Sequence, residues 1–216
     1  MEWAKVEYQL FKKLFPEEKL LCTAYTPEAL DDLGVRLDVR VSDLWRLSPE
    51  DMKRAEKEKN EVWGLRWLCQ YNTYEFPRHF AGFGLDRMGL DGFTEWTYYG
   101  APLYRPYDQM VHFPGCHYSF TDEKGNLLNT IPWEASQEGI DDSRYVATLR
   151  ELIDRGSASS DAKQKMLAGV ASKKLDKLIA GLPYRPKIVS ETELARLRGE
   201  IAGELLQLIR SGITVQ

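Results

Sequence analysis

The sequence has few of the features that point directly to a function. It holds three cysteines, an odd number without CxxC spacing, so we expect reduced thiols rather than a disulfide framework. No apolar run approaches the roughly 18 residues of a membrane span. The N-terminus "MEWAKVEYQLFKKLF" is acidic as well as basic, unlike a signal peptide. We therefore expect a cytoplasmic protein without a membrane segment.

Several classes of ligand are also not expected. A formal net charge of -4 over 216 residues argues against a nucleic-acid surface, because such surfaces are basic. The segment "AGFG" follows no predicted strand, so it is not a dinucleotide fingerprint, and no P-loop, GxSxG or HExxH occurs. His112, Cys116 and His117 are close in sequence, but Pro114 and Gly115 break the local geometry and no fourth ligand is suitably spaced. We expect neither a metal nor a cofactor.

The composition, 43% hydrophobic and 29% charged, is that of a globular protein, and helices and strands are predicted to alternate in the first half of the chain. The first 15 residues place six large apolar side chains on one helical stripe: Trp3, Val6, Leu10, Phe11, Leu14 and Phe15. A cap residue followed by proline predicts further helices at Thr26 and Ser48. Another helix is predicted over 77–90, and four strands over 19–25, 36–45, 61–71 and 91–99. Such alternation predicts βα units with parallel strands.

The second half is predicted to be mainly helical. The turn "DEKGN" indicates a possible hairpin, and an amphipathic helix over 132–156 is expected to end at Gly156. Two more helices are predicted over 157–183 and 190–212. Aromatic residues are concentrated in the middle of the chain, since 16 of the 25 Phe, Trp and Tyr residues lie between Trp63 and Phe120. After Tyr145 only Tyr184 follows. We therefore expect any chemistry in the middle of the chain.

The predicted strand ends suggest a ligand. In parallel βα architectures ligands bind at the carboxyl ends of the strands. The residues expected there are aromatic, acidic or amide-bearing: Tyr25, Asp43, Trp45, Asn72, Tyr74, Glu95, Trp96, Tyr98 and Tyr99. Aromatic faces stack on the C–H faces of sugar rings, and carboxylates and amides hydrogen-bond hydroxyl pairs. The set therefore favours a carbohydrate, with Glu95 and Asp43 as the candidate catalytic carboxylates and the others as substrate-binding residues.

Each of these residues also has a plainer interpretation. A Trp or Tyr on a strand is more often core than binding platform, and we assign Trp63 and Trp67 to packing. Glu95 could instead pair with an arginine such as Arg66 or Arg105, and Asp43 could cap the helix that starts a few residues later. The stretch "IDDSR" (140–144) is most simply a salt-bridged or capping cluster on a helix.

Residues 113–149, "FPGCHYSFTDEKGNLLNTIPWEASQEGIDDSRYVATL", resemble the closing segment of glycoside hydrolase family 123 and the related domain of unknown function 4091. Phe113-Pro114-Gly115 matches that family's "YPG" loop, Pro132-Trp133-Glu134 its "RWE" helix start, and Gln137 to Asp142 its "REGIEDY" stretch. Upstream, "GLDGFTEWTYYG" is similar to the eighth barrel strand, and "KLLCTAY", "LDVRVSDLW" and "EVWGLRW" resemble strands five to seven. The resemblance covers about residues 1–155.

This resemblance implies an α/β fold, a partial (β/α)8 TIM barrel of about four βα units. We expect a half-barrel over 1–156 and a helical C-terminal extension over 157–216. It also implies an N-acetyl-hexosaminidase type of glycosidase, whose Asp-Glu pair follows the fourth strand. No such pair precedes "KLLCTAY", and Asp122-Glu123 lies in a turn and does not match. Sugar binding is therefore expected more than hydrolysis, with Glu95 as the best remaining acid/base candidate.

A half-barrel would expose two sheet edges and an apolar concave face. We therefore expect a homo-oligomer, a dimer in the simplest case, or C-terminal helices that cover the opening. Two alternatives stay open. One is a non-catalytic carbohydrate-binding or assembly protein, from a truncated or metagenome-derived reading frame. The other is a scaffold domain whose aromatic residues are simply core.

Overall fold

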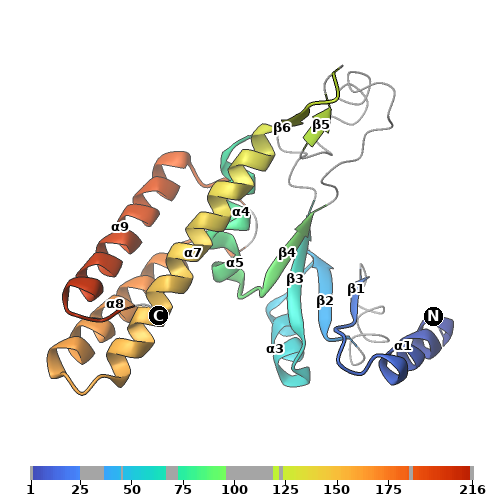
Figure 1. Cartoon of the computed structure of the whole chain (residues 1–216), viewed down its shortest axis with the longest axis horizontal. Coiled ribbons are helices and arrows are strands. Elements are labelled where there is room, and N and C mark those ends of the chain that lie inside the picture. The colour runs from blue at the N-terminus through green and yellow to red at the C-terminus, as the bar shows by residue number, and fades with distance from the viewer. Residues whose placement is uncertain are drawn as a thin grey trace. The chain divides into compact units, whose positions relative to one another are not determined.

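The computed structural model describes residues 2–24, 37–44, 46–66, 73–95, 119–121, 124–184 and 187–214. The chain divides into two compact units (Figure 1). The first, here called the strand unit, takes Met1–Trp67 and Gly89–Trp96. The second, here called the helix unit, takes Leu68–Met88 and Thr97–Gln216. Both are described separately below.

The strand unit is built on one four-stranded sheet. Its strands are β1 (Leu21–Ala24), β2 (Val39–Asp43), β3 (Glu61–Arg66) and β4 (Gly92–Glu95), in the order β1-β2-β3-β4. All three pairs are parallel, which confirms the predicted parallel strands. Each strand lies beside its neighbour in the sequence, and apolar residues of β2 and β3 form a small core in which Trp63 packs against Val39, Val41 and Leu65. The packing role expected for Trp63 is thus confirmed.

Helix α3 (Pro49–Glu58) begins where its capping signal predicts. Ser48 Oγ accepts a 3.1 Å hydrogen bond from Asp51 N, and Asp51 Oδ2 accepts one of 2.9 Å from Ser48 N, a complete capping box. The helix ends at Lys59, whose φ of 58° is left-handed. Near this end, Glu58 pairs with the buried Arg40 of β2. The helix is therefore joined to the sheet by charge as well as by apolar packing.

Helix α1 (Glu2–Leu14) forms as predicted, but it packs through a different face from the predicted stripe. Ala4, Tyr8 and Phe11 pack with Leu20, Leu37 and Cys22. Five of the six stripe residues are more than half exposed: Trp3, Val6, Leu10, Leu14 and Phe15. The predicted stripe is therefore mostly exposed, and the covered face of α1 is a different one. The small side chain of Ala4 marks the face where the helix comes close to the rest of the unit.

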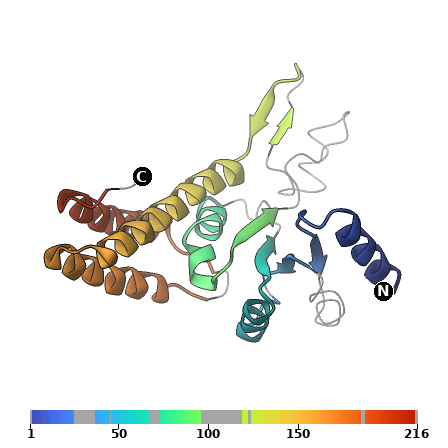
Figure 2. The same cartoon turned by 60° about the horizontal axis from the view of Figure 1, so that its bottom comes forward.

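The helix unit contains α4 (Glu75–Ala81), α5 (Phe83–Met88), α7 (Ile131–Ala158), α8 (Ala162–Ala180) and α9 (Glu191–Arg210). Helices α7, α8 and α9 lie side by side (Figure 2). They share one core, whose fully buried members include Phe83 of α5 and Leu149, Leu152, Leu194 and Ile201. The domain boundary expected after residue 156 falls in the last turn of α7, whereas these contacts group α7 with the two helices that follow it.

Two helix ends differ from the prediction, in both cases at a glycine. The single helix expected over 77–90 is interrupted at Gly82, which has a non-helical ψ of -120°. A Cβ there would lie 2.8 Å from the Gly139 carbonyl oxygen. Gly156 does not end α7, which continues to Ala158; a Cβ at Gly156 would lie 2.8 Å from Ala168 Cβ. Both glycines serve close packing between helices, a purpose that local turn signals do not distinguish from termination.

The predicted hairpin around "DEKGN" is confirmed. Strands β5 (Ser119–Thr121) and β6 (Leu127–Asn129) pair antiparallel, and Gly125 between them has a φ of +82°. Helices α8 and α9 also follow the prediction, with Asp161 and Ser190 as their N-caps. Across the described ranges, no helix combines the length and apolar character needed to cross a membrane.

A buried histidine makes the stability of the helix unit sensitive to pH. His79 of α4 is 2% exposed, and its Nδ1 has no hydrogen-bond partner in the described part of the chain. Burial lowers the pKa of His79 to about 4, below the value of about 6.5 in an unfolded chain. Between these two values the unfolded chain binds a proton that the native protein does not. Stability should therefore fall as the pH is lowered through this window, by about 3 kcal/mol in total.

The variant His79→Leu should lack this contribution, since leucine has no proton to bind. The measurement is urea unfolding of both proteins at pH 7, 6, 5 and 4, comparing the difference between them so that carboxylates common to both cancel. We expect the wild type to lose about 3 kcal/mol more than the variant over this range. Parallel pH profiles would contradict the assignment of a neutral buried His79.

Candidate functional site

The carboxyl edge of the parallel sheet brings together the two predicted catalytic positions. Asp43 is the last residue of β2 and Glu95 the last of β4, with β3 between them. Asp43 pairs in register with Leu65, and Glu95 pairs with Arg66 one residue further on. Two strand spacings separate β2 from β4, or about 10 Å. Because residues alternate between the faces of a sheet, the register puts Asp43 on the face of Leu65 and Glu95 on the opposite face, so the two positions share the edge but not the face.

The backbone around Asp43 and Glu95 bears on the other roles expected for them, a helix cap and an ion pair. The N-cap of α3 is Ser48, so Asp43 does not cap that helix; instead its carbonyl oxygen accepts hydrogen bonds of 2.9 and 3.1 Å from Arg46 N and Leu47 N. This turns the chain away from the sheet immediately after Asp43. For Glu95, the register places Arg66 beside it on β3. The pairing of Glu95 with Arg66 therefore stays open as an alternative to a catalytic role.

The predicted substrate-binding residues lie mostly outside the described part of the chain. Tyr25, Trp45, Asn72, Trp96, Tyr98 and Tyr99 lie outside the described residues, and the structure describes only the backbone of Glu95. Tyr74 is described, but it belongs to the helix unit, where it precedes α4 at the N-cap position. The candidate site therefore consists of two acidic positions at one sheet edge, and the predicted aromatic platform stays a prediction.

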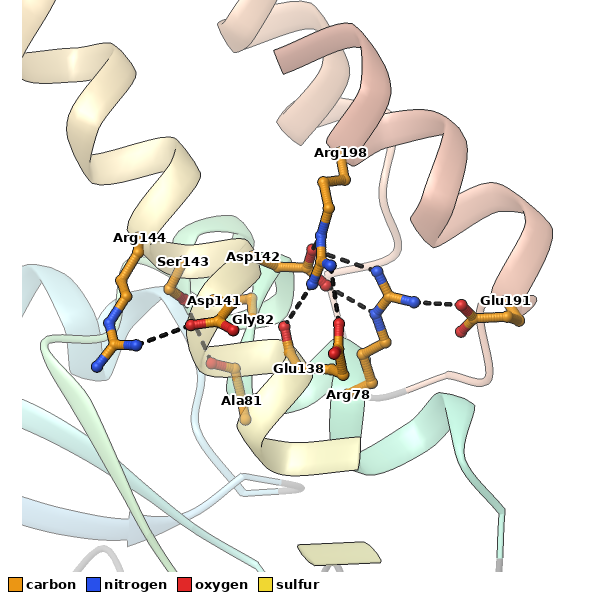
Figure 3. Close-up of polar contacts among 10 residues, drawn as sticks. All are labelled: Arg78, Ala81, Gly82, Glu138, Asp141, Asp142, Ser143, Arg144, Glu191 and Arg198. Atoms are coloured by element: carbon orange, nitrogen blue, oxygen red, sulfur yellow. Dashed lines mark hydrogen bonds and ion pairs between the residues drawn. The ribbon is translucent and has the colours of Figure 1, made fainter. Parts of the chain in front are cut away.

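The helix unit contains a second polar arrangement, here called the clamp cluster, made of Arg78, Glu138, Asp142, Glu191 and Arg198 (Figure 3). Asp142 of α7 is fully buried and accepts a 2.9 Å hydrogen bond from Arg78 Nε of α4. Arg198 of α9 donates to Asp142 as well, and to the Glu138 side chain at 2.7 Å. Arg78 also pairs with Glu191 at the start of α9. Three helices are thus joined through a single buried carboxylate.

The electrostatics indicate that the clamp cluster holds fixed charges. Burial alone would lower the pKa of Arg78, but the hydrogen bonds and charges of Asp142 and Glu191 outweigh it and raise that pKa. The pKa of Arg198 is raised against burial in the same way by Asp142 and Glu138. Burial, with the charge of Glu138 adding to it, also raises the pKa of the nearby Tyr74. Groups held in one charge state suit a structural role better than proton transfer.

Around the clamp cluster, the backbones of α7 and α4 also lie in direct contact. A Cβ at Gly139 of α7 would fall against the Arg78 carbonyl oxygen, far inside van der Waals contact, and 2.9 Å from Ala81 Cβ. Ser143 Oγ donates to the Ala81 and Gly82 carbonyl oxygens at 3.2 Å each. The stretch from Glu138 to Ser143 therefore holds α7 directly on the end of α4.

The interpretation of "IDDSR" as a salt-bridged cluster is confirmed, with a division of roles. Asp141 lies on the exposed side of α7, where it accepts a 2.7 Å bond from Arg144 three residues later. Asp142 faces inward to Arg78 and Arg198. The sequence indicated the first pair through its local spacing. The partners of Asp142 lie 64 and 56 residues away, so no local signal identified them.

A polar groove of about 370 Å³ lies in the strand unit at the amino ends of β2 and β3. It is lined by Tyr8, Gln9, Lys12, Leu37, Asp38, Glu58, Lys59 and Asn60. Lys12 bridges to Asp38 at 2.6 Å; burial opposes ionisation of Asp38, but the Lys12 hydrogen bond prevails and lowers its pKa. This groove lies at the opposite ends of the strands from the expected ligand edge, and no motif among its lining residues predicts it.

No protein-family model matches the sequence, and no curated protein matches it. The resemblance to glycoside hydrolase family 123 therefore depends on the motifs quoted above. Of those motifs, the stretch from Gln137 to Asp142 has a physical role in the structure, as the α7 segment that contacts α4 and α9.

Proposed function

We propose that this chain is a glycoside hydrolase-like protein that binds carbohydrate at the carboxyl edge of its sheet, as the C-terminal half of a (β/α)8 barrel would. The observation that supports it is the strand order β1-β2-β3-β4 with every pair parallel. In a (β/α)8 barrel each strand lies beside its sequence neighbours, whereas a doubly wound sheet reverses its order at the ligand crevice. The observed order is the one that a barrel segment requires.

In this proposal the two acids have distinct roles. Glu95 is the acid/base group and Asp43 hydrogen-bonds sugar hydroxyls or assists as the second carboxylate. Both end their strands, so both belong to the edge where barrel ligands bind. Trp45, Trp96, Tyr98 and Tyr99 follow these ends closely in the sequence and would supply stacking faces for the sugar. Binding is proposed ahead of hydrolysis, because the family's Asp-Glu pair has no match in this sequence.

One observation favours a second candidate, a non-catalytic binding or assembly protein that acts as a dimer. The most specific of the quoted motifs, Gln137 to Asp142, makes structural contacts in the helix unit, and burial of Asp142 leaves its carboxylate no open side. This motif therefore does not support a catalytic role for the chain. The two candidates differ in whether bound sugar is turned over.

The test is turnover of chromogenic N-acetyl-hexosaminides and simple hexosides, with sugar-dependent thermal stability measured on the same samples. The variants are Asp43→Asn and Glu95→Gln, with Glu56→Gln on the exposed surface of α3 as the matched control. We expect a sugar-dependent rise in Tm that both site variants lose and the control keeps. Turnover abolished by Glu95→Gln would identify an enzyme, and a rise in Tm without turnover would identify a binding protein. A panel that produces neither effect would contradict the proposal.

A further inference from the structure

Helix α1 has two apolar faces, and within the described part of the chain only one of them is covered. Ala4, Tyr8 and Phe11 pack inward. On another face lie four large apolar side chains with exposed fractions of 69, 63, 53 and 61%, here called the outer α1 stripe: Trp3, Val6, Leu10 and Leu14. Their spacing of three, four and four residues forms the continuous seam of a helix that packs against another helix. A helix face that stays in water usually carries polar side chains instead.

The outer α1 stripe is large enough to form an interface. Trp3 leaves roughly 150 Å² of surface in water and each of the other three side chains roughly 100 Å², so the stripe amounts to about 450 Å². Patches of this size on a single chain commonly mark interaction sites. Two copies of the stripe would together bury on the order of 1,000 Å², which is the lower bound for a specific protein interface.

We propose that the outer α1 stripe is the interface with a second copy of this chain, with the two α1 helices antiparallel. The charges of the helix favour this occupant. In the first half of α1, Glu2 and Glu7 outnumber Lys5, and the last turn carries Lys13 beside the stripe; Lys12 lies on the opposite side of the helix, where it pairs with Asp38. An antiparallel pair places the acidic half of each copy against the basic end of the other and opposes the two helix dipoles.

A parallel pair would instead place Lys13 of both copies at the same end of the pair. The antiparallel pair is also self-complementary, so it closes as a two-fold dimer and leaves no stripe free for further growth. The inference goes beyond the proposed function, because this self-association requires no sugar and involves neither Asp43 nor Glu95.

The first experiment measures mass by light scattering over a range of protein concentrations. We expect twice the chain mass of 24.9 kDa, falling to the single-chain mass for Leu10→Glu, with dimer dissociation at least tenfold easier. Gln9→Glu adds the same charge at an exposed position of α1 outside the stripe and should leave the mass unchanged. Leu10→Gln serves as a second, uncharged variant, and circular dichroism checks that each variant is folded. A monomer at every concentration, or a dimer indifferent to both Leu10 variants, would overturn the proposal.

The second experiment tests the direction of the pair. In an antiparallel pair centred on the stripe, position 2 of one copy lies near position 13 of the other. Lys13→Glu alone should therefore weaken the dimer several-fold, and adding Glu2→Lys should restore it. If the double variant is no tighter than the single one, α1 does not pair with itself in this way.

Discussion

Replacing Asp142 by alanine is expected to destabilise the helix unit by about 3–5 kcal/mol. Asp142 is fully buried and is the carboxylate shared by Arg78 and Arg198. Without it, the guanidinium of Arg78, which is 3% exposed, would lose its main buried counter-charge. The measurement is urea unfolding followed by the helical circular dichroism signal, which α7, α8 and α9 dominate.

The neighbouring residue offers a matched control. Asp141 carries the same side chain one position earlier on α7, but it is half exposed, and its ion pair is with the exposed Arg144 three residues later. Asp141→Ala should therefore change stability by less than about 0.5 kcal/mol. Equal losses for the two variants would show that the clamp cluster does not have the stabilising role described here.

Replacing Gly139 by alanine is expected to cost at least about 3 kcal/mol, the upper end of the range for overpacking. The added Cβ would meet the Arg78 carbonyl oxygen and the Ala81 Cβ, so α4 and α7 would have to separate. No change of side-chain rotamer can relieve this contact, because the position of a Cβ is fixed by the backbone and its closest neighbour is a backbone oxygen. Thermal unfolding measures the loss.

The control for this substitution has the opposite expected sign. Gly203 lies within α9, and a Cβ there would have no heavy atom within 4 Å. Gly203→Ala should therefore stabilise the protein by about 0.5–1 kcal/mol, as expected for replacing glycine in a helix interior. Destabilisation by both substitutions, to a similar extent, would mean that the close approach of α7 to α4 is not what Gly139 provides.

Together these predictions give a physical reason for the stretch from Glu138 to Asp142. Gly139 allows two helices to touch, Asp142 neutralises a buried arginine, and Glu138 holds Arg198 of α9. A sequence pattern of this kind can recur because it preserves packing. Its presence therefore supports a likeness of structure more directly than a likeness of activity.

The parts of the fold that the sequence predicted well are those with local causes. The capping box of α3 involves residues within one turn, and the alternation of Val39 and Val41 marks β2 over five residues. The turn at Gly125 likewise depends on one residue that adopts a positive φ easily. Parallel strands then followed from the alternation of elements, which leaves few other arrangements.

The parts that were wrong depend on distant contacts. Gly156 was expected to end a helix, yet it lies inside α7 at a point where α8 approaches. On α1, the predicted stripe of large apolar residues is mostly exposed, whereas Ala4 and Tyr8 face the unit. A glycine that ends a helix and a glycine that lets two helices pack closely look alike in the local sequence. The same holds for a buried and an exposed apolar face, so only the contacts of the folded chain distinguish them.

For the candidate site, the sequence led to Asp43 and Glu95 because parallel strands align their carboxyl ends at one edge. It did not lead to the polar groove at the opposite end, whose lining residues carry no recognisable motif. Nor did it identify the outer α1 stripe as a surface, because the same periodicity describes a buried and an exposed apolar face.

The most direct test of sugar binding at the sheet edge is saturation-transfer difference NMR with a mixture of N-acetylated and simple hexoses. It requires no turnover, so it tests binding separately from catalysis and from dimer formation. We expect transfer to at least one sugar with the wild type and with Glu56→Gln, and none with the double variant Asp43→Asn/Glu95→Gln. Equal transfer with the double variant, or no transfer to any sugar from the wild type, would contradict it.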